Sequence, residues 1–73
     1  SMHQPNVWTF DSSVELELPL YAQPSSHSKL LGWLHRGADV QLRGSFHLSW
    51  VKVRIHDNVV GWLQYSAFGV QQL

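Results

Sequence analysis

The stretch SWVKVRIHDNVVGWLQ, residues 49–64, alternates apolar and polar side chains on both sides of a polar turn. Alternation with a period of two is the pattern of a β-strand with one buried face. The stretch therefore predicts two strands joined as a hairpin. Each strand brings a tryptophan, Trp50 or Trp62, beside charged or polar neighbours. These indoles either pack to hold a small fold together or stay exposed to hold a ligand.

The length of the hairpin turn decides which face the tryptophans occupy. A two-residue turn at Asp57 and Asn58 would place Leu63 on the same face as the charged side chains. A three-residue turn over 56–58, with Asn58 in the left-handed conformation, keeps the apolar side chains together on one face. This register predicts the pairs Ile55 with Val59, Val53 with Gly61 and Val51 with Leu63. The opposite, outer face then holds Trp50, Lys52, Arg54, Val60 and Trp62.

The rest of the chain also predicts short strands separated by turns. Val14, Leu16 and Leu18 alternate with two glutamates, which predicts a strand over about 13–18. Residues 19–28 contain two prolines and three serines, a composition typical of a surface loop. Further strands are expected over 29–35, 40–44 and 50–56, with connections at 36–39 and 45–49. No segment shows helical spacing over three turns, so helix is limited to one turn near 64–68, and the chain is predicted to be all-β.

Two segments share a Gly-Trp-Leu motif: LLGWL at 30–34 and VVGWL at 59–63. A repeat architecture needs three or more copies, so two copies indicate two strands that meet similar demands. A glycine inside a strand often marks a close approach of another backbone. We therefore expect tight packing at Gly32 and Gly61.

Composition limits the class of protein. The 73 residues make one small domain with 44% hydrophobic residues and four tryptophans, which is globular composition. Five Lys/Arg balance five Asp/Glu without a long run of one sign, which argues against nucleic acid as a partner. There is no cysteine to form a disulfide, and no apolar run approaches the roughly 20 residues of a membrane span.

Several segments together resemble the bacterial SH3 (SH3b) family over about residues 16–69. They are LPLYAQPSSHSKLLGWLHRGADVQL, then SWVKVRI, VGWL and SAF. The positions that match the family's pattern are Leu18, Leu20, Pro24, Ser25, Leu31, Gly32, Leu34, Gly37, Val40, Trp50, Val51, Val53, Gly61, Trp62 and Leu63. The sequence departs from it at Trp33, where members usually have a small or polar residue, and at SFHLS, which is longer and more apolar than the usual turn. Gln64 and Ala67 stand where the eukaryotic SH3 groove has proline and tyrosine, so proline-rich peptides are not the expected ligand.

The resemblance implies a small SH3-like β-barrel of five or six strands, with no helix beyond a single 3-10 turn. Residues 13–73 would form the barrel, residues 3–12 an N-terminal extension that can add a strand, and residues 1–2 a cloning scar followed by a start. It also implies a non-catalytic targeting module that binds peptidoglycan peptides, with a location in the cell envelope or outside the cell.

The ligand-binding residues expected on this basis are Tyr21, His27, Trp33, Trp50, Trp62 and Tyr65. Aromatic rings would supply desolvated area and polar edges would set orientation. The alternative is an interaction module, in which the aromatic surface docks a partner protein or a second copy in a weak homodimer. Neither reading needs a cofactor, and no metal-ligand spacing or catalytic motif occurs. His56 and Asp57 are adjacent, and we expect them to shape the hairpin turn.

Overall fold

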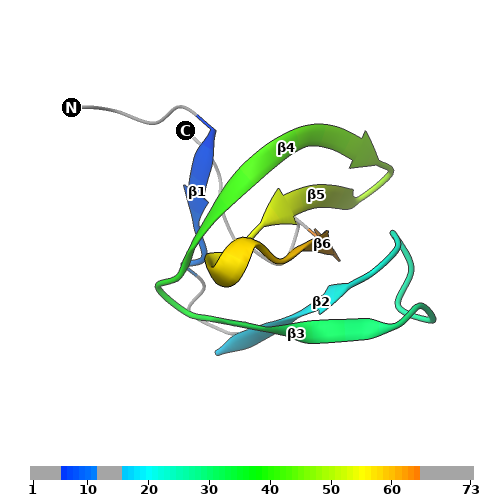
Figure 1. Ribbon diagram of the computed structural model, residues 1–73, viewed down its shortest axis with the longest axis horizontal. Coiled ribbons are helices and arrows are strands. Elements are labelled where there is room, and N and C mark those ends of the chain that lie inside the picture. The colour runs from blue at the N-terminus through cyan, green and yellow to red at the C-terminus, as the bar shows by residue number, and fades with distance from the viewer. Residues whose placement is uncertain (1–5, 12–15, 65–73) are drawn as a thin grey trace.

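The computed structural model describes residues 6–11 and 16–64 of the chain, and one antiparallel sheet organises them (Figure 1). The strands are β1 (Val7–Thr9), β2 (Glu17–Tyr21), β3 (Leu30–His35), β4 (Asp39–His47), β5 (Trp50–Arg54) and β6 (Val60–Gln64). They are arranged in the order β1-β4-β5-β6-β2-β3. In the described part of the chain β1 and β3 are the edge strands, so the sheet curls without closing.

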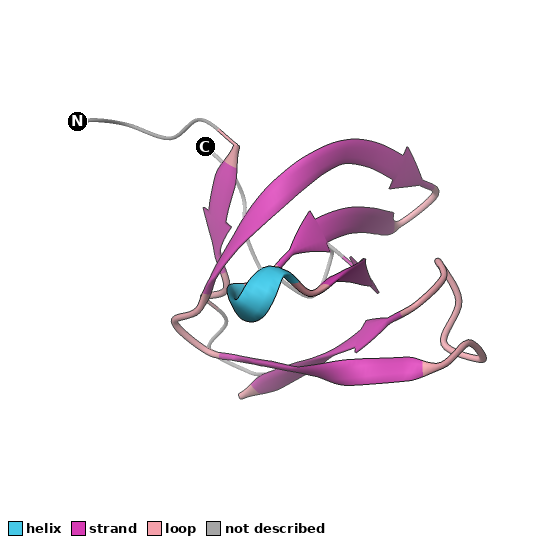
Figure 2. Cartoon of the chain, viewed as in Figure 1, coloured by secondary structure: helices cyan, strands magenta, loops and turns pink. Residues whose placement is uncertain are grey.

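The only helical element in the described ranges is the 3-10 turn η1 (His56–Asn58), shown in cyan in Figure 2. The prediction of an all-β, SH3-like fold with no helix beyond a single 3-10 turn is therefore confirmed. The turn expected near 64–68 lies outside the described residues from 65 onward. Within the described ranges no helix is long and apolar enough to cross a bilayer.

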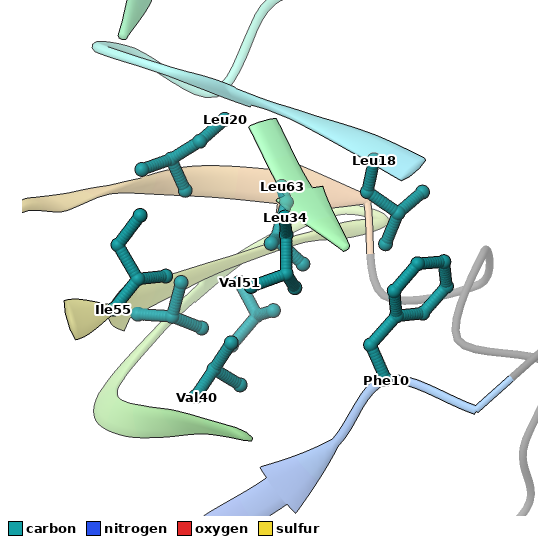
Figure 3. Packing of buried hydrophobic residues seen from close by; sticks show 9 residues of the cluster. Phe10, Leu18, Leu20, Leu34, Val40, Val51, Ile55 and Leu63 are labelled. Atoms are coloured by element: carbon teal, nitrogen blue, oxygen red, sulfur yellow. The ribbon is translucent and has the colours of Figure 1, made fainter. Parts of the chain in front are cut away.

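The core lies on the concave side of the curled sheet, and almost every strand contributes to it (Figure 3). Alternation places one side chain in two inside, so β5 contributes Val51 and Val53 while β6 contributes Leu63. The buried cluster consists of Phe10, Leu18, Leu20, Leu34, Val40, Val51, Val53, Ile55 and Leu63. A core of nine side chains is small, as expected for a chain of this length.

The hairpin of β5 and β6 has the predicted register. Val51 pairs with Leu63 and Val53 with Gly61, and the amide of Ile55 donates to the carbonyl of Val59 at 2.8 Å. Asn58 is left-handed as expected, with φ 60°, and Asp57 joins it with φ 62°. Asx side chains tolerate this conformation better than most residues, which explains why both stand in the turn.

The close approach expected at the two glycines occurs at only one of them. A Cβ on Gly61 would lie 2.8 Å from both Leu20 Cγ and the carbonyl oxygen of Tyr21. A Cβ on Gly32 would meet nothing within 4 Å. The shared motif therefore reflects tight packing of β6 against β2, and nothing comparable holds at β3.

The strand predicted over 13–18 overlaps the observed β2 only at residues 17 and 18; residue 16 is not in a strand, and residues 13–15 lie outside the described ranges. β2 runs over Glu17–Tyr21, with Leu18 and Leu20 buried, whereas the expected core residue Leu16 is 66% exposed. Pro19 had suggested a loop, because proline cannot donate to a ladder. It is tolerated here because β2 pairs with β6 at Tyr21 and not at Pro19.

Residues 45–47, predicted as part of a connection, belong instead to β4. The pairing of β4 with β5 shifts between Leu42, opposite Val53, and Phe46, opposite Val51. Four steps along β4 thus match two steps along β5, which is an extended bulge. Gly44, with φ 85°, lies inside it. The bulge lets β4 continue to His47, so that only residues 48 and 49 connect the two strands.

Residues 7–10 are attached to the sheet by backbone and side chain. Trp8 pairs with Val40, so β1 extends the sheet beyond β4. The amide of Phe10 donates to Ala38 at 2.9 Å, and the amide of Gly37 donates to Phe10 at 2.7 Å. The Phe10 side chain is completely buried. This short segment therefore closes one side of the core.

Candidate functional site

Three side chains form a row across the outer face of the sheet. Trp62 on β6 pairs directly with Lys52 on β5 and with Tyr21 on β2. Directly paired residues of neighbouring strands project from the same face of a sheet. The residues next to them in each strand, such as Val53 and Leu20, are buried, so the row Lys52, Trp62 and Tyr21 points away from the core.

The two aromatic rings of this row are accessible but not fully exposed. Both Tyr21 and Trp62 are half-buried. Such a position leaves part of each ring available to a ligand while neighbouring groups restrict its rotation. Tyrosine and tryptophan offer large contact areas at a low cost in conformational entropy, which is why they dominate many binding surfaces. We call Tyr21, Lys52 and Trp62 the aromatic row.

Trp50 supports the aromatic row from below. It starts β5 on the same face as Lys52, yet only 8% of it is exposed. Its ring lies edge-on to Tyr21, with centroids 5.8 Å apart and an angle of 77° between the planes, a favourable geometry for aromatic pairs. Trp50 is not a member of the core cluster. It is buried on the outer side, where it holds the ring of Tyr21 in place.

Trp33 extends the aromatic surface toward the edge of the sheet. It stands on β3 opposite Pro19 and is 49% exposed. Pro19 and Tyr21 alternate with buried leucines along β2, so Trp33 shares the outer face with the aromatic row. Leu30, opposite Tyr21 and 43% exposed, adds apolar area on the same strand.

His27 lies in the loop of residues 22–29, which follows Tyr21 directly. This loop is closed by its own hydrogen bonds: the amide of Ala22 donates to Lys29 at 2.8 Å, and the Ser28 hydroxyl donates to the Ser25 carbonyl at 2.7 Å. The amide of His27 donates to the Ser25 hydroxyl at 3.1 Å. The backbone that carries the exposed imidazole is thus ordered before any ligand arrives.

The remaining expected site residue, Tyr65, lies outside the described residues. Among residues 6–11 and 16–64, no three potential metal ligands come together. His56 Nδ1 and Asp57 Oδ2 are 3.1 Å apart, and both belong to the 3-10 turn at the end of the β5–β6 hairpin. The contact lies within the turn itself, and both side chains are largely exposed.

Sequence reasoning missed the turn between β4 and β5 as a surface of interest. Leu48, at this turn, is 83% exposed and Phe46 is 55% exposed. Two large apolar side chains at this end of the β4–β5 hairpin are therefore largely exposed. The unusual length and apolar character of SFHLS was the available signal, but it was assigned only to a connection.

Comparison with known proteins agrees with this geometry. The family model described as bacterial SH3 domain matches residues 17–68, more than half of the chain. No curated protein and no solved structure gives a significant match. The matched range includes β2 to β6 and the whole aromatic row, whereas β1 and Phe10 precede it. On the evidence of this match and of the all-β fold, the chain belongs to the bacterial SH3 domain family.

Proposed function

We propose that this domain is a non-catalytic binding module that recognises short peptides of the kind found in peptidoglycan. Domains of the family are generally non-catalytic binding modules. The observation that carries the proposal is the aromatic row, in which Trp62 and Tyr21 stand side by side on the outer face and Trp50 supports Tyr21 from beneath.

The chemistry of the row suits a short, partly apolar peptide. The indole and phenol rings can cover aliphatic parts of a ligand, and the Lys52 ammonium beside Trp62 can pair with a ligand carboxylate. Trp33 would extend contact along β3, and His27 would lie at the rim as a hydrogen-bond donor or acceptor. Trp50 contributes by positioning Tyr21, since little of its own surface is accessible.

The test is a titration of the labelled domain with soluble peptidoglycan fragments, followed by NMR of the tryptophan indole N–H groups. Saturable shifts are expected at Trp62 and Trp33. Trp8 serves as an internal control, because β1 lies at the opposite edge of the sheet from β3. Unchanged indole signals at millimolar fragment concentration would exclude this ligand class.

Two substitutions distinguish a tryptophan that contacts the ligand from one that only supports the binding surface. Trp62→Ala should weaken fragment binding by about 30-fold, equivalent to about 2 kcal/mol, while the domain stays folded. Trp50→Ala should lower the free energy of unfolding by about 3 kcal/mol, because it removes a buried indole. If Trp62→Ala unfolds the domain instead, Trp62 is a packing residue and the assigned surface is wrong.

A second candidate function is self-association through β3. Among the described residues β3 pairs only with β2, and its side chains include the exposed Leu30 and Trp33. Unpaired strand edges with apolar side chains are prone to pair with another chain. Sedimentation analysis over a range of concentrations would show a monomer–dimer equilibrium, and Trp33→Glu should abolish it. A concentration-independent monomer would exclude this candidate.

A further inference from the structure

The charged side chains of this neutral protein are unevenly distributed along the long axis of the molecule. The described acids lie at the ends of elements: Asp11 follows β1, Glu17 begins β2, Asp39 begins β4 and Asp57 lies in η1. Figure 1 places all of these segment ends at one end of the horizontal long axis. The Thr9 hydroxyl donates to Asp39 at 2.7 Å, so the end of β1 lies beside the start of β4. We call this region the acidic end.

The opposite end of the molecule is formed by the loop of residues 22–29 and by the turn between β4 and β5 (Figure 1). The only charged residue in that loop is Lys29. Residues 40–56, which span the β4–β5 hairpin, include Arg43, Lys52 and Arg54 but no acid. We call the loop together with this hairpin turn the basic end. Two of the five cations lie at the acidic end, because Arg36 is in the turn before β4 and Arg54 ends β5 next to η1. The other three, Lys29, Arg43 and Lys52, have no described acid on their side of the molecule, so that side has a net positive charge.

The turn at the basic end also presents apolar side chains. Leu48 is 83% exposed and Phe46 is 55% exposed. Leu48 also has φ 54°, a left-handed conformation that disfavours a leucine and suits glycine or asparagine. A leucine at this position therefore helps neither the turn nor the core. A residue kept in an unfavourable conformation and exposed to water points to a contact outside the domain.

We propose that the basic end docks on the surface of a bilayer that contains anionic lipids. Leu48 and Phe46 would enter the boundary between headgroups and acyl chains, while Arg43 and Lys29 would lie near the anionic headgroups. A hairpin turn at the end of the long axis can reach a flat surface, whereas the acidic end stays away from it. A soluble polyanion would satisfy the cations but would leave both apolar side chains in water.

The docking is weak and reversible on its own. A single myristoyl chain gives an association constant of about 10⁴ M⁻¹ for lipid, and one leucine with one phenylalanine buries less apolar surface than that chain. The expected partition therefore needs millimolar lipid. It would orient the domain, with the aromatic row of the sheet still open to a second ligand, and it does not depend on the function proposed above.

The test is cosedimentation of the complete chain with sucrose-loaded vesicles. One set consists of phosphatidylcholine and roughly one-third phosphatidylglycerol, and the other of phosphatidylcholine alone. Binding is expected to the anionic vesicles and to fall as salt is raised, because screening weakens the attraction of the cations. Absence of the wild-type chain from the anionic vesicle pellet at low salt overturns the proposal.

Three substitutions identify the contact. Leu48→Asn, which suits the left-handed backbone, should keep the fold and the fragment-induced indole shifts but lower the lipid partition about tenfold. Arg43→Glu should lower it about thirtyfold, because it changes the local charge by two. Leu16→Asn is the matched control: Leu16 is 66% exposed beside Glu17 at the acidic end, and its replacement should leave the partition unchanged.

Two further results would refute the proposal. If Leu48→Asn binds vesicles like the wild type, the attraction is purely electrostatic and the apolar turn does not enter the bilayer. If Leu16→Asn weakens vesicle binding as much as Leu48→Asn, the loss of an exposed leucine at either end has the same effect, and the basic end is not the docking surface. Binding of a leucine-rich acidic peptide at the Leu48 amide, without any vesicle binding, would instead assign the basic end to a protein partner.

Discussion

Two tryptophans on one face of the same hairpin have different surroundings. Trp62 lies between Lys52 and Tyr21 and is half-buried. Trp50 is almost inaccessible, and Tyr21 packs edge-on against it. Position within the hairpin does not distinguish them, since both belong to the outer face. β2 brings Tyr21 next to both indoles, and the buried one supports its ring while the half-buried one stays accessible.

Gly61 offers a direct test of how closely β2 and β6 pack. Gly61→Ala should lower the free energy of unfolding by about 1–3 kcal/mol, because the new Cβ would overlap Leu20 Cγ and the Tyr21 carbonyl. Urea denaturation would measure the change. Because the overlap moves β2, the same substitution should also reduce the fragment-induced shift of the Trp62 indole.

The matched control is Gly32→Ala, in the same Gly-Trp-Leu motif. A Cβ there meets nothing within 4 Å. The substitution should therefore be neutral or stabilise the domain by up to about 1 kcal/mol, because alanine lowers the conformational entropy of the unfolded chain. Equal effects at the two glycines would contradict the difference in packing that the structure shows.

At the level of elements, the β5–β6 hairpin depends on its turn more than on any single strand residue. Asp57 and Asn58 both have positive φ, and together they create the three-residue loop that sets the register. A shift of one residue would exchange the two faces of β6. Leu63 would then leave the core and Trp62 would enter it, so the aromatic row exists only in this register.

A substitution in the turn tests that dependence. Asn58→Val should cost about 1–2 kcal/mol of stability, because a β-branched residue is strongly disfavoured at φ 60°. Asn58→Gly should stay within about 0.5 kcal/mol of the wild type, since glycine adopts this conformation freely. Thermal unfolding of both variants measures the comparison. A valine variant as stable as the glycine variant would show that the turn relaxes to another conformation.

At the level of the whole molecule, the folded unit begins before the matched family range. Phe10 lies outside residues 17–68 but is completely buried in the core. Its backbone joins the turn before β4 through two hydrogen bonds, with Ala38 and Gly37. We therefore expect a chain that starts at residue 17 to be much less stable than the full chain.

Phe10→Ala isolates the side-chain contribution. Removal of a fully buried phenylalanine should cost about 3–5 kcal/mol, which is a large fraction of the stability of a small domain. Phe46→Ala, at a position that is 55% exposed, should cost well under half as much. Chemical denaturation with two probes, far-ultraviolet circular dichroism and tryptophan fluorescence, would compare them. A loss below about 1 kcal/mol for Phe10→Ala would mean that the N-terminal segment is dispensable.

The amino-acid sequence alone determined the fold class, the register of the β5–β6 hairpin and the side of the sheet on which Trp50 and Trp62 lie. These features follow from alternation and turn chemistry among residues close together in the chain. Strand boundaries were harder to predict: Pro19 concealed the second half of β2, and the bulge at Gly44 concealed the second half of β4. In both cases a pairing with another strand overrides the local signal.

Only the tertiary structure decided that Trp50 is buried, that Phe10 completes the core and that charges are unevenly distributed between the two ends. Each of these depends on which distant segments become neighbours: Tyr21 comes over Trp50, β1 joins β4, and four acids meet where several strands begin or end. Composition shows a neutral chain with four tryptophans. The position of each charge and ring in space depends on long-range strand pairing, which no local pattern encodes.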